Sequence, residues 1–280
     1  MLVFNFGQYN EEREILQITI LDSIYNSRLG RLLIFHGGTG LRLCYRSDRF
    51  SDDLDFRGSL SGKEFNELKD IIYSELVKKI AHRVEIGSNE KDNLYQIVTK
   101  VHPKDKSKKL LKVNITISPI KPLTSEFINA YSKYYPTLSV PVYVESLEEI
   151  LADKLVAFGL RNFTENAPFK ARDLWDIYWI IQHNIKLDGN MVFIKLQSYN
   201  VTFDQFTILV KNKLDFLCTK KGTHSFKDEI DRFLDNSHKS LILEENSVKS
   251  ILKAISSFYN NALEDLTKHK TKDKKHGLET

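Results

Sequence analysis

A glycine pair that interrupts a short apolar run, followed closely by two carboxylates, constrains the fold of this chain more than any other feature. The run at residues 31–35 is typical of a buried strand, and it ends at Gly37 and Gly38, where a helix should begin. Thr39 has the hydroxyl that a helix N-cap uses, so we expect it to cap that helix. The sequence therefore predicts a strand, a tight turn and a helix in immediate succession.

Two carboxylates, Asp53 and Asp55, lie at alternate positions of the next apolar segment, residues 49–56. Side chains at i and i+2 of a strand point to the same face, so both carboxylates should project together while Leu54 and Phe56 anchor the opposite face. Carboxylate oxygens suit a hard cation such as Mg²⁺, with Mn²⁺ as the alternative, and glycine lets backbone N–H groups approach phosphate oxygens. The combination predicts a site for a metal ion and a triphosphate.

Either feature alone says little about function, because Gly-Gly turns are common and an Asp-x-Asp pair is more often part of a solvated loop. The combination is more specific. It resembles the nucleotidyltransferase superfamily and, within it, the AbiEii/AbiGii toxin family, which includes the MenT-like toxins of type IV toxin–antitoxin systems. That family carries a Gly-Gly-Thr turn and an Arg-x-Ser-x-Asp-Leu-Asp-Phe strand. The matching residues here are Gly37, Gly38, Thr39, Arg49, Ser51, Asp53, Leu54, Asp55 and Phe56.

A β-hairpin with a basic loop is expected from two apolar segments, residues 94–101 and 110–117. On the second strand, Lys112 and Asn114 share the face opposite the apolar side chains. Many nucleotidyltransferases place a third metal-binding carboxylate on this strand, and Asn114 is the matching position. An amide oxygen can ligate a metal but carries no charge, so Asp53 would share most of the metal binding with Asp55, and a role for Asn114 stays open.

A lysine lies within the apolar stripe of a later helix. Ser146 opens a Ser-x-x-Glu capping box, and at about 100° per residue Lys154 falls among the apolar positions, with Arg161 on the same side. A lysine on such a face either extends its ammonium to solvent or contacts an anion in a cleft. The sequence leaves both interpretations open.

The next helix, expected over residues 171–183, begins with Arg172 and Asp173. An Arg-Asp pair at a helix start often serves only as a cap and dipole contact. The AbiEii-like family, however, has a lysine in an apolar helix and then Arg-Asp-x-x-Asp on the following one. This resemblance implies that Lys154 contacts the nucleotide, Asp173 is a further catalytic acid, Arg172 orients or contacts phosphate, and Asp176 is structural.

Length and composition are ordinary for a globular protein of one large or two modest domains, with 280 residues, 28% charged and 41% apolar. No apolar run is long enough to span a membrane and no signal-peptide pattern is present, so we expect a cytoplasmic protein that does not enter a membrane. Cys44 and Cys218 lie far apart and match no metal-ligand spacing, which predicts reduced thiols.

The fold class that these patterns and the resemblance imply is α/β, or α+β: a nucleotidyltransferase-type mixed sheet flanked by helices, then a C-terminal helical bundle. A proline-bearing passage, residues 119–141, suggests the boundary. We therefore assign residues 1–143 to the α/β domain. Residues 144–280 form the helical domain, which is expected to contribute Lys154 and Asp173 to the cleft.

The leading functional hypothesis is a Mg²⁺-dependent nucleotidyltransferase that moves NMP from an NTP to RNA. Arg42 and Arg49 are further candidates for phosphate contacts. Family resemblance implies the tRNA 3′ end as one acceptor, a toxin role and a cognate antitoxin. The net charge of +4 and the lysine-rich segments 104–112 and 268–275 suit a polyanionic partner, although such runs are usually solvated loops. The alternatives are nucleotidylation of a protein or small molecule, and a non-catalytic nucleotide- or RNA-binding module.

Overall fold

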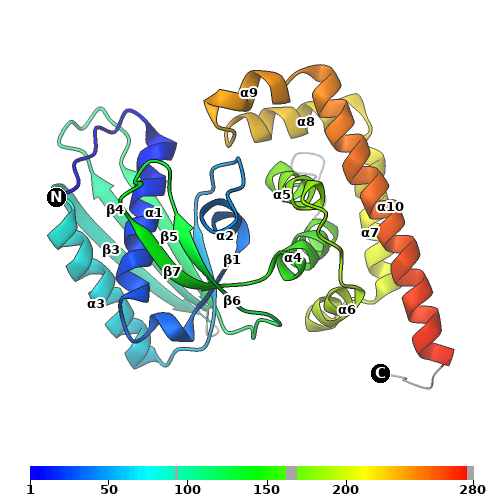
Figure 1. Cartoon of the computed structure of the whole chain (residues 1–280), viewed down its shortest axis with the longest axis horizontal. Helices are drawn as coiled ribbons and strands as arrows, with labels where there is room; N and C mark the ends of the chain where they lie inside the picture. Colours follow the sequence, from blue (N-terminus) through cyan, green and yellow to red (C-terminus); the bar gives the residue numbers. More distant parts are fainter. Residues whose placement is uncertain (92–93, 162–168, 276–280) are drawn as a thin grey trace. The chain divides into compact units, whose positions relative to one another are not determined.

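The computed structural model describes residues 1–91, 94–161 and 169–275. The chain divides into two compact units, Met1–Ser146 (unit 1) and Leu147–Thr280 (unit 2). Figure 1 colours the chain from blue at the N-terminus to red at the C-terminus. The sequence-based boundary at residues 143/144 and the shared cleft stay predictions. Each unit is described by itself.

Unit 1 is built on a seven-stranded mixed sheet in the order β3-β4-β5-β2-β1-β7-β6, so the predicted mixed sheet is confirmed. β1 runs antiparallel to β2 and parallel to β7, while β2 runs parallel to β5. The remaining neighbours, β3 with β4, β4 with β5, and β6 with β7, are antiparallel. The strands are β1 (Ile34–His36), β2 (Leu54–Arg57), β3 (Arg83–Lys91), β4 (Leu94–His102), β5 (Leu111–Ser118), β6 (Glu126–Tyr131) and β7 (Ser139–Val144).

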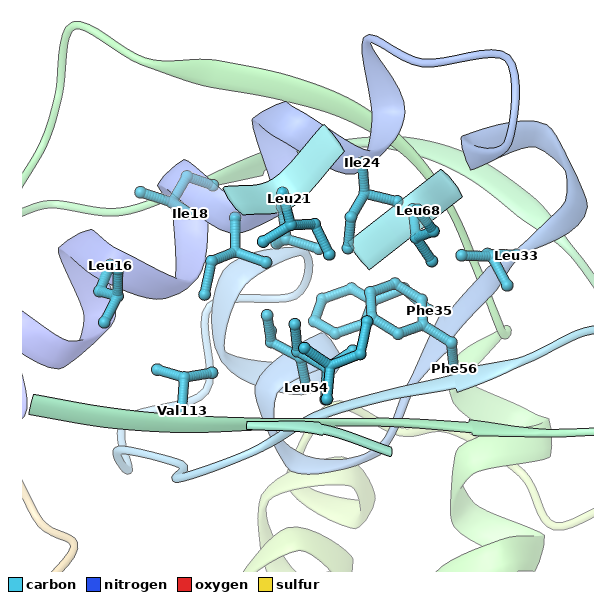
Figure 2. Packing of buried hydrophobic residues seen from close by; sticks show 14 of the residues in the cluster. Leu16, Ile18, Leu21, Ile24, Leu33, Phe35, Leu54, Phe56, Leu68 and Val113 are labelled. Carbon is cyan, nitrogen blue, oxygen red and sulfur yellow. The ribbon is translucent and has the colours of Figure 1, made fainter. Parts of the chain in front are cut away.

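Helices α1 (Tyr9–Tyr25) and α3 (Gly62–Lys79) lie side by side on one face of this sheet (Figure 1). Figure 2 shows their apolar side chains meeting those of the strands in one core. Burying each large aliphatic or aromatic side chain stabilises the fold by about 1.5–3 kcal/mol. The labelled core residues are Leu16, Ile18, Leu21, Ile24, Leu33, Phe35, Leu54, Phe56, Leu68 and Val113.

Several predicted elements are present. β5 alternates as expected, with Leu111 and Val113 buried while Lys112 and Asn114 face away from the core. The hairpin with β4 pairs Val101 with Leu111, so its connecting loop lies where the basic segment predicts a turn. This hairpin prediction is confirmed.

The glycine turn is placed correctly, but two local details are wrong. The residue that caps α2 (Gly37–Leu43) is His36, and Thr39 lies inside the helix, where its hydroxyl bonds to a backbone oxygen instead. The strand expected from residue 31 begins only at Ile34, because Gly30–Leu32 form a short 3₁₀ turn. A tertiary hydrogen bond to Asp53 accounts for the position of Thr39. The late start of the strand has a local cause, because the backbone N–H groups of Leu32 and Leu33 bond to oxygens three residues earlier.

Unit 2 is helical among the described residues, as the resemblance predicts. Figure 1 shows the long helix α10 running alongside α7, and α4 packs against α5, α6 and α7. No helix of the described chain is long and apolar enough to cross a membrane. The basic run from residue 268 continues α10, and its side chains from residue 269 onward lie outside the described residues. The helices are α4 (Leu147–Leu160), α5 (Ala171–Gln182), α6 (Gly189–Ser198), α7 (Phe203–Leu217), α8 (Lys220–Asp231), α9 (Asn236–Ile242) and α10 (Glu245–Lys275).

Candidate active site

The glycine turn between β1 and α2 is closely surrounded by the residues that the sequence groups with it. Gly37 has a φ of +76°, a conformation that side chains disfavour, and a Cβ added there would lie 3.2 Å from Oδ2 of Asp55. A Cβ on Gly38 would overlap the guanidinium of Arg49 and lie 2.9 Å from Oγ of Ser51. The turn therefore needs glycine at both positions, and it brings Arg49, Ser51 and Asp55 to one place.

The two carboxylates at the start of β2 lie beside this turn. Asp55 is the register partner of His36, and the hydroxyl of Thr39 donates to the backbone oxygen of Asp53. Both carboxylates are half-buried, as the alternation predicts. The carboxylate pair and the helix N-terminus thus share one edge of the sheet, where α2 directs backbone N–H groups outward.

Asn114 of β5 contacts the Asp53 carboxylate. Its Nδ2 lies 2.7 Å from Oδ1 of Asp53 and donates a hydrogen bond to it. Asn114 therefore holds Asp53 in position, which is a function that the sequence alone left open.

The donor set of this edge fits a hard divalent cation. Asp53 and Asp55 offer carboxylate oxygens from one face of a strand, and both retain access to solvent. Asn114 contributes a hydrogen-bond donor to Asp53. A bound metal would therefore take its protein charge from the two aspartates, with substrate phosphates completing its ligands.

The two arginines proposed for phosphate contacts, Arg42 and Arg49, have structural partners in unit 1. Arg49 is 2% exposed, and its Nη1 donates to the backbone oxygen of Phe50 at 2.9 Å. Arg42 pairs with Glu14 through Nε at 2.8 Å and donates to the backbone of Ser47. Arg49 thus supports the glycine turn directly, whereas Arg42 ties α2 to α1.

Unit 2 brings the second predicted group of residues together. Nζ of Lys154, on α4, lies 3.1 Å from Asp173 and 2.8 Å from Asp176, both on α5. Its side chain is 13% exposed, and the aspartates are almost fully buried. The ammonium is therefore held by two carboxylates. The structure thus excludes the interpretation in which Lys154 extends its ammonium into solvent.

Positive charge gathers around Asp173. Arg161 binds its second oxygen through Nε at 2.8 Å. Burial, then the charges of Arg161 and Arg172, lower the pKa of Lys170. The guanidinium of Arg172 itself lies 3.9 Å from Glu229 and 4.5 Å from the ring centre of Phe233. The start of α5 therefore gathers several cations and carboxylates, and Arg172 is turned toward α8 and its C-terminal end.

Sequence reasoning missed Lys213 of α7. This fully buried lysine donates to the backbone oxygens of Phe158 at 2.6 Å, Gly159 at 2.9 Å and Arg161. The three bonds satisfy the carbonyls that end α4, where a cation is favourable. Lys213 falls within the apolar stripe of its helix, so the signal that identified Lys154 could have found it.

Comparison with known proteins agrees with this arrangement. The family model described as nucleotidyl transferase AbiEii toxin, type IV TA system, matches residues 19–254. No curated protein matches the chain.

Solved structures share the fold at low sequence identity. JHP933 from Helicobacter pylori has a TM-score of 0.56 at 17% identity, covering 95% of this chain and 97% of that chain. A further H. pylori structure has a TM-score of 0.54 at 18% identity, covering 93% and 98%. MenT4, a nucleotidyltransferase toxin from Mycobacterium tuberculosis, has a TM-score of 0.50 at 16% identity, covering 90% and 95%. With its family model matched over most of its length, this chain belongs to the AbiEii family of nucleotidyltransferase toxins.

Proposed function

We propose that the protein transfers a nucleoside monophosphate from an NTP to RNA in a Mg²⁺-dependent reaction. The observation that carries this proposal is the placement of Asp53 and Asp55 beside the glycine turn at the start of α2. Carboxylates for a cation and N–H groups for phosphate then lie at one edge of the sheet. The 3′ end of tRNA is the acceptor that the family resemblance favours.

The proposed reaction is a displacement at the α-phosphorus. The acceptor hydroxyl oxygen forms a bond to that phosphorus, the bond to the β-phosphate oxygen breaks, and pyrophosphate leaves. A carboxylate of the Asp53–Asp55 pair takes the hydroxyl proton. Mg²⁺, when held by the two aspartates, supplies positive charge to the triphosphate.

We assign the charged residues of unit 2 to the phosphates. Lys154 offers a compact ammonium, and Asp173 and Asp176 fix its position. Arg161 and Arg172 add positive charge near the start of α5. This assignment makes Lys154 and Asp173 as necessary for transfer as the aspartates of unit 1.

The biological setting follows from the family. A toxin of a type IV system acts inside the cell that makes it and is paired with an antitoxin, so we propose a cytoplasmic protein with a cognate antitoxin. An RNA acceptor also agrees with the net charge of +4.

The test incubates purified protein with Mg²⁺, total cellular RNA and each labelled NTP in turn. Asp53→Asn and Asp55→Asn keep the side-chain size but remove a charge, so we expect transfer to fall by at least about a hundredfold. Asp52→Asn is the matched control, because it removes one charge from the neighbouring residue, whose carboxylate pairs with Arg13 at 2.5 Å. Electrophoresis reports the labelled product.

Three outcomes would contradict the proposal in different ways. Label that migrates with protein or with small molecules would change the acceptor. NTP binding without transfer to any acceptor would indicate a non-catalytic module. Equal loss in the Asp52 variant would show that Asp53 and Asp55 have no special place in the reaction.

A further inference from the structure

The β4–β5 hairpin has six lysines between residues 100 and 112, and the structure places four of them in two separate groups. Lys108 donates through Nζ to the backbone oxygen of Asn5 at 2.6 Å. Nζ of Lys109 lies 4.1 Å from the ring centre of Tyr9. These two lysines are therefore held by the N-terminal segment and the start of α1.

Lys100 and Lys112 form a second group on the sheet itself. They are register partners on β4 and β5, so their side chains project from the same face. Lys112 precedes Asn114 by two residues, about 7 Å along the strand, and Asn114 contacts Asp53. The two lysines thus lie on the face that carries the candidate catalytic carboxylates, and this face is opposite the core formed with α1 and α3.

This placement is unfavourable for the isolated fold. Like charges directly opposite each other on neighbouring strands repel. Glu85 is the register partner of Lys100 on β3, but it also pairs with Arg83 and lies 3.0 Å from His102. One carboxylate therefore faces the charges of both Arg83 and Lys100, and Lys112 is exposed, so the face keeps excess positive charge beside the site.

We propose that this face of β4–β5, through Lys100 and Lys112, binds the phosphodiester backbone of the acceptor RNA as it approaches Asp53 and Asp55. The inference rests on the proposed function and identifies where its acceptor lies. A linear polyanion can contact positive charges on two neighbouring strands while its end reaches the carboxylates. A single triphosphate, held at the glycine turn, has no need of this second set of charges.

The experiment compares two double variants of the full chain. Lys100→Ala with Lys112→Ala removes the charges on the sheet face, and Lys108→Ala with Lys109→Ala removes the same number from the same hairpin. Binding of a fluorescein-labelled 12-nucleotide single-stranded RNA is measured by anisotropy at several salt concentrations. Calorimetry measures NTP–Mg²⁺ binding by each protein.

We expect the Lys100/Lys112 variant to bind RNA on the order of tenfold more weakly. The slope of log K against log salt should fall by about 1.4, or 0.7 for each lost phosphate contact. KM for RNA should rise with little change in kcat. The Lys108/Lys109 variant should bind RNA like the unmodified protein, and NTP binding should stay the same in both.

Equal losses in the two variants, or no loss in either, would overturn the proposal. So would an equal loss of binding to poly-L-glutamate, because the face would then suit acidic protein as well as RNA. Failure of the proposed function has a different signature. There, the unmodified protein would bind no NTP or transfer no nucleotide, whatever its affinity for RNA.

Discussion

At the scale of single residues, Gly38 has the most restrictive surroundings in the candidate site. An added Cβ would overlap the Arg49 guanidinium and approach Ser51 Oγ to 2.9 Å. Arg49 is buried and bonded to the backbone of Phe50, so it cannot yield freely. The side chains of Arg49 and Ser51 therefore leave space only for glycine at position 38.

Gly38→Ala should reduce nucleotidyl transfer by about tenfold to a hundredfold, because displacement of the turn by even 1 Å misplaces the groups that hold phosphate. Gly62→Ala is the control, since a Cβ there meets nothing within 4 Å and glycine is a poor helix former. Initial rates with saturating RNA measure the effect. Unchanged activity in Gly38→Ala would argue against a tight turn at this position.

For Asn114, the sequence predicts which face of β5 carries the side chain but not which residue it contacts. Its place on β5 is predictable from alternation, and the structure confirms that it faces away from the core. Its hydrogen bond to Asp53 depends on the parallel pairing of β2 and β5, which join residues far apart in sequence. No local pattern contains that information.

At the scale of elements, α4 ends on a buried charge. Lys213 donates to three backbone carbonyls at this end, and the last of them belongs to Arg161, whose side chain binds Asp173. Burial, and then the Arg161 guanidinium, lower the pKa of Lys213 to about 8, while Asp173 opposes this shift. The end of α4 thus connects α7 to the group around Lys154.

The lowered pKa predicts a specific pH dependence of stability. Below about pH 8, Lys213 is charged in both the folded and the unfolded chain, and the cost of burying the charge is fully present. Between pH 8 and the ordinary lysine value of 10.5, the unfolded chain binds more protons, so the free energy of unfolding should rise with pH, by at most about 3 kcal/mol.

Urea unfolding of the unmodified protein and Lys213→Met, at pH 7 and at pH 9.5, tests this expectation. Methionine has a similar length but does not titrate, so the difference between the two unfolding free energies isolates Lys213. That difference should move in favour of the unmodified protein as pH rises. A constant difference would mean that the pKa of Lys213 is not lowered.

At the scale of the whole molecule, the two units carry different parts of the predicted machinery. Unit 1 has its own core and contains the glycine turn, Asp53 and Asp55. Unit 2 contains Lys154 and Asp173. Family membership covers both units, because the matched residues extend from α1 into α10.

A fragment of residues 1–146 should therefore fold but fail to transfer nucleotide. Its sheet and its core with α1 and α3 are complete without unit 2. Circular dichroism should show a cooperative thermal transition, and the labelled-NTP assay should show no product. Transfer at the rate of the full chain would mean that Lys154 and Asp173 are dispensable.

Elements with a strong apolar pattern, and the motifs that identify the family, can be predicted from local sequence. The β4–β5 hairpin and the alternation around Asp53 follow from local periodicity. β3 and β6 were not predicted, because these outer strands are half exposed and obtain their order from hydrogen bonds to a neighbouring strand. The periodicity of apolar residues indicates which side chains are buried. It does not indicate a strand that is stabilised mainly by backbone hydrogen bonds to its neighbour.

Which polar groups come into contact depends on the tertiary fold. It joined Asn114 to Asp53, gave Thr39 a backbone partner in place of a capping role, and placed Lys213 at the end of α4. Each of these contacts links segments distant in the chain. They depend on strand order and helix packing, which are set by the whole core rather than by neighbouring residues.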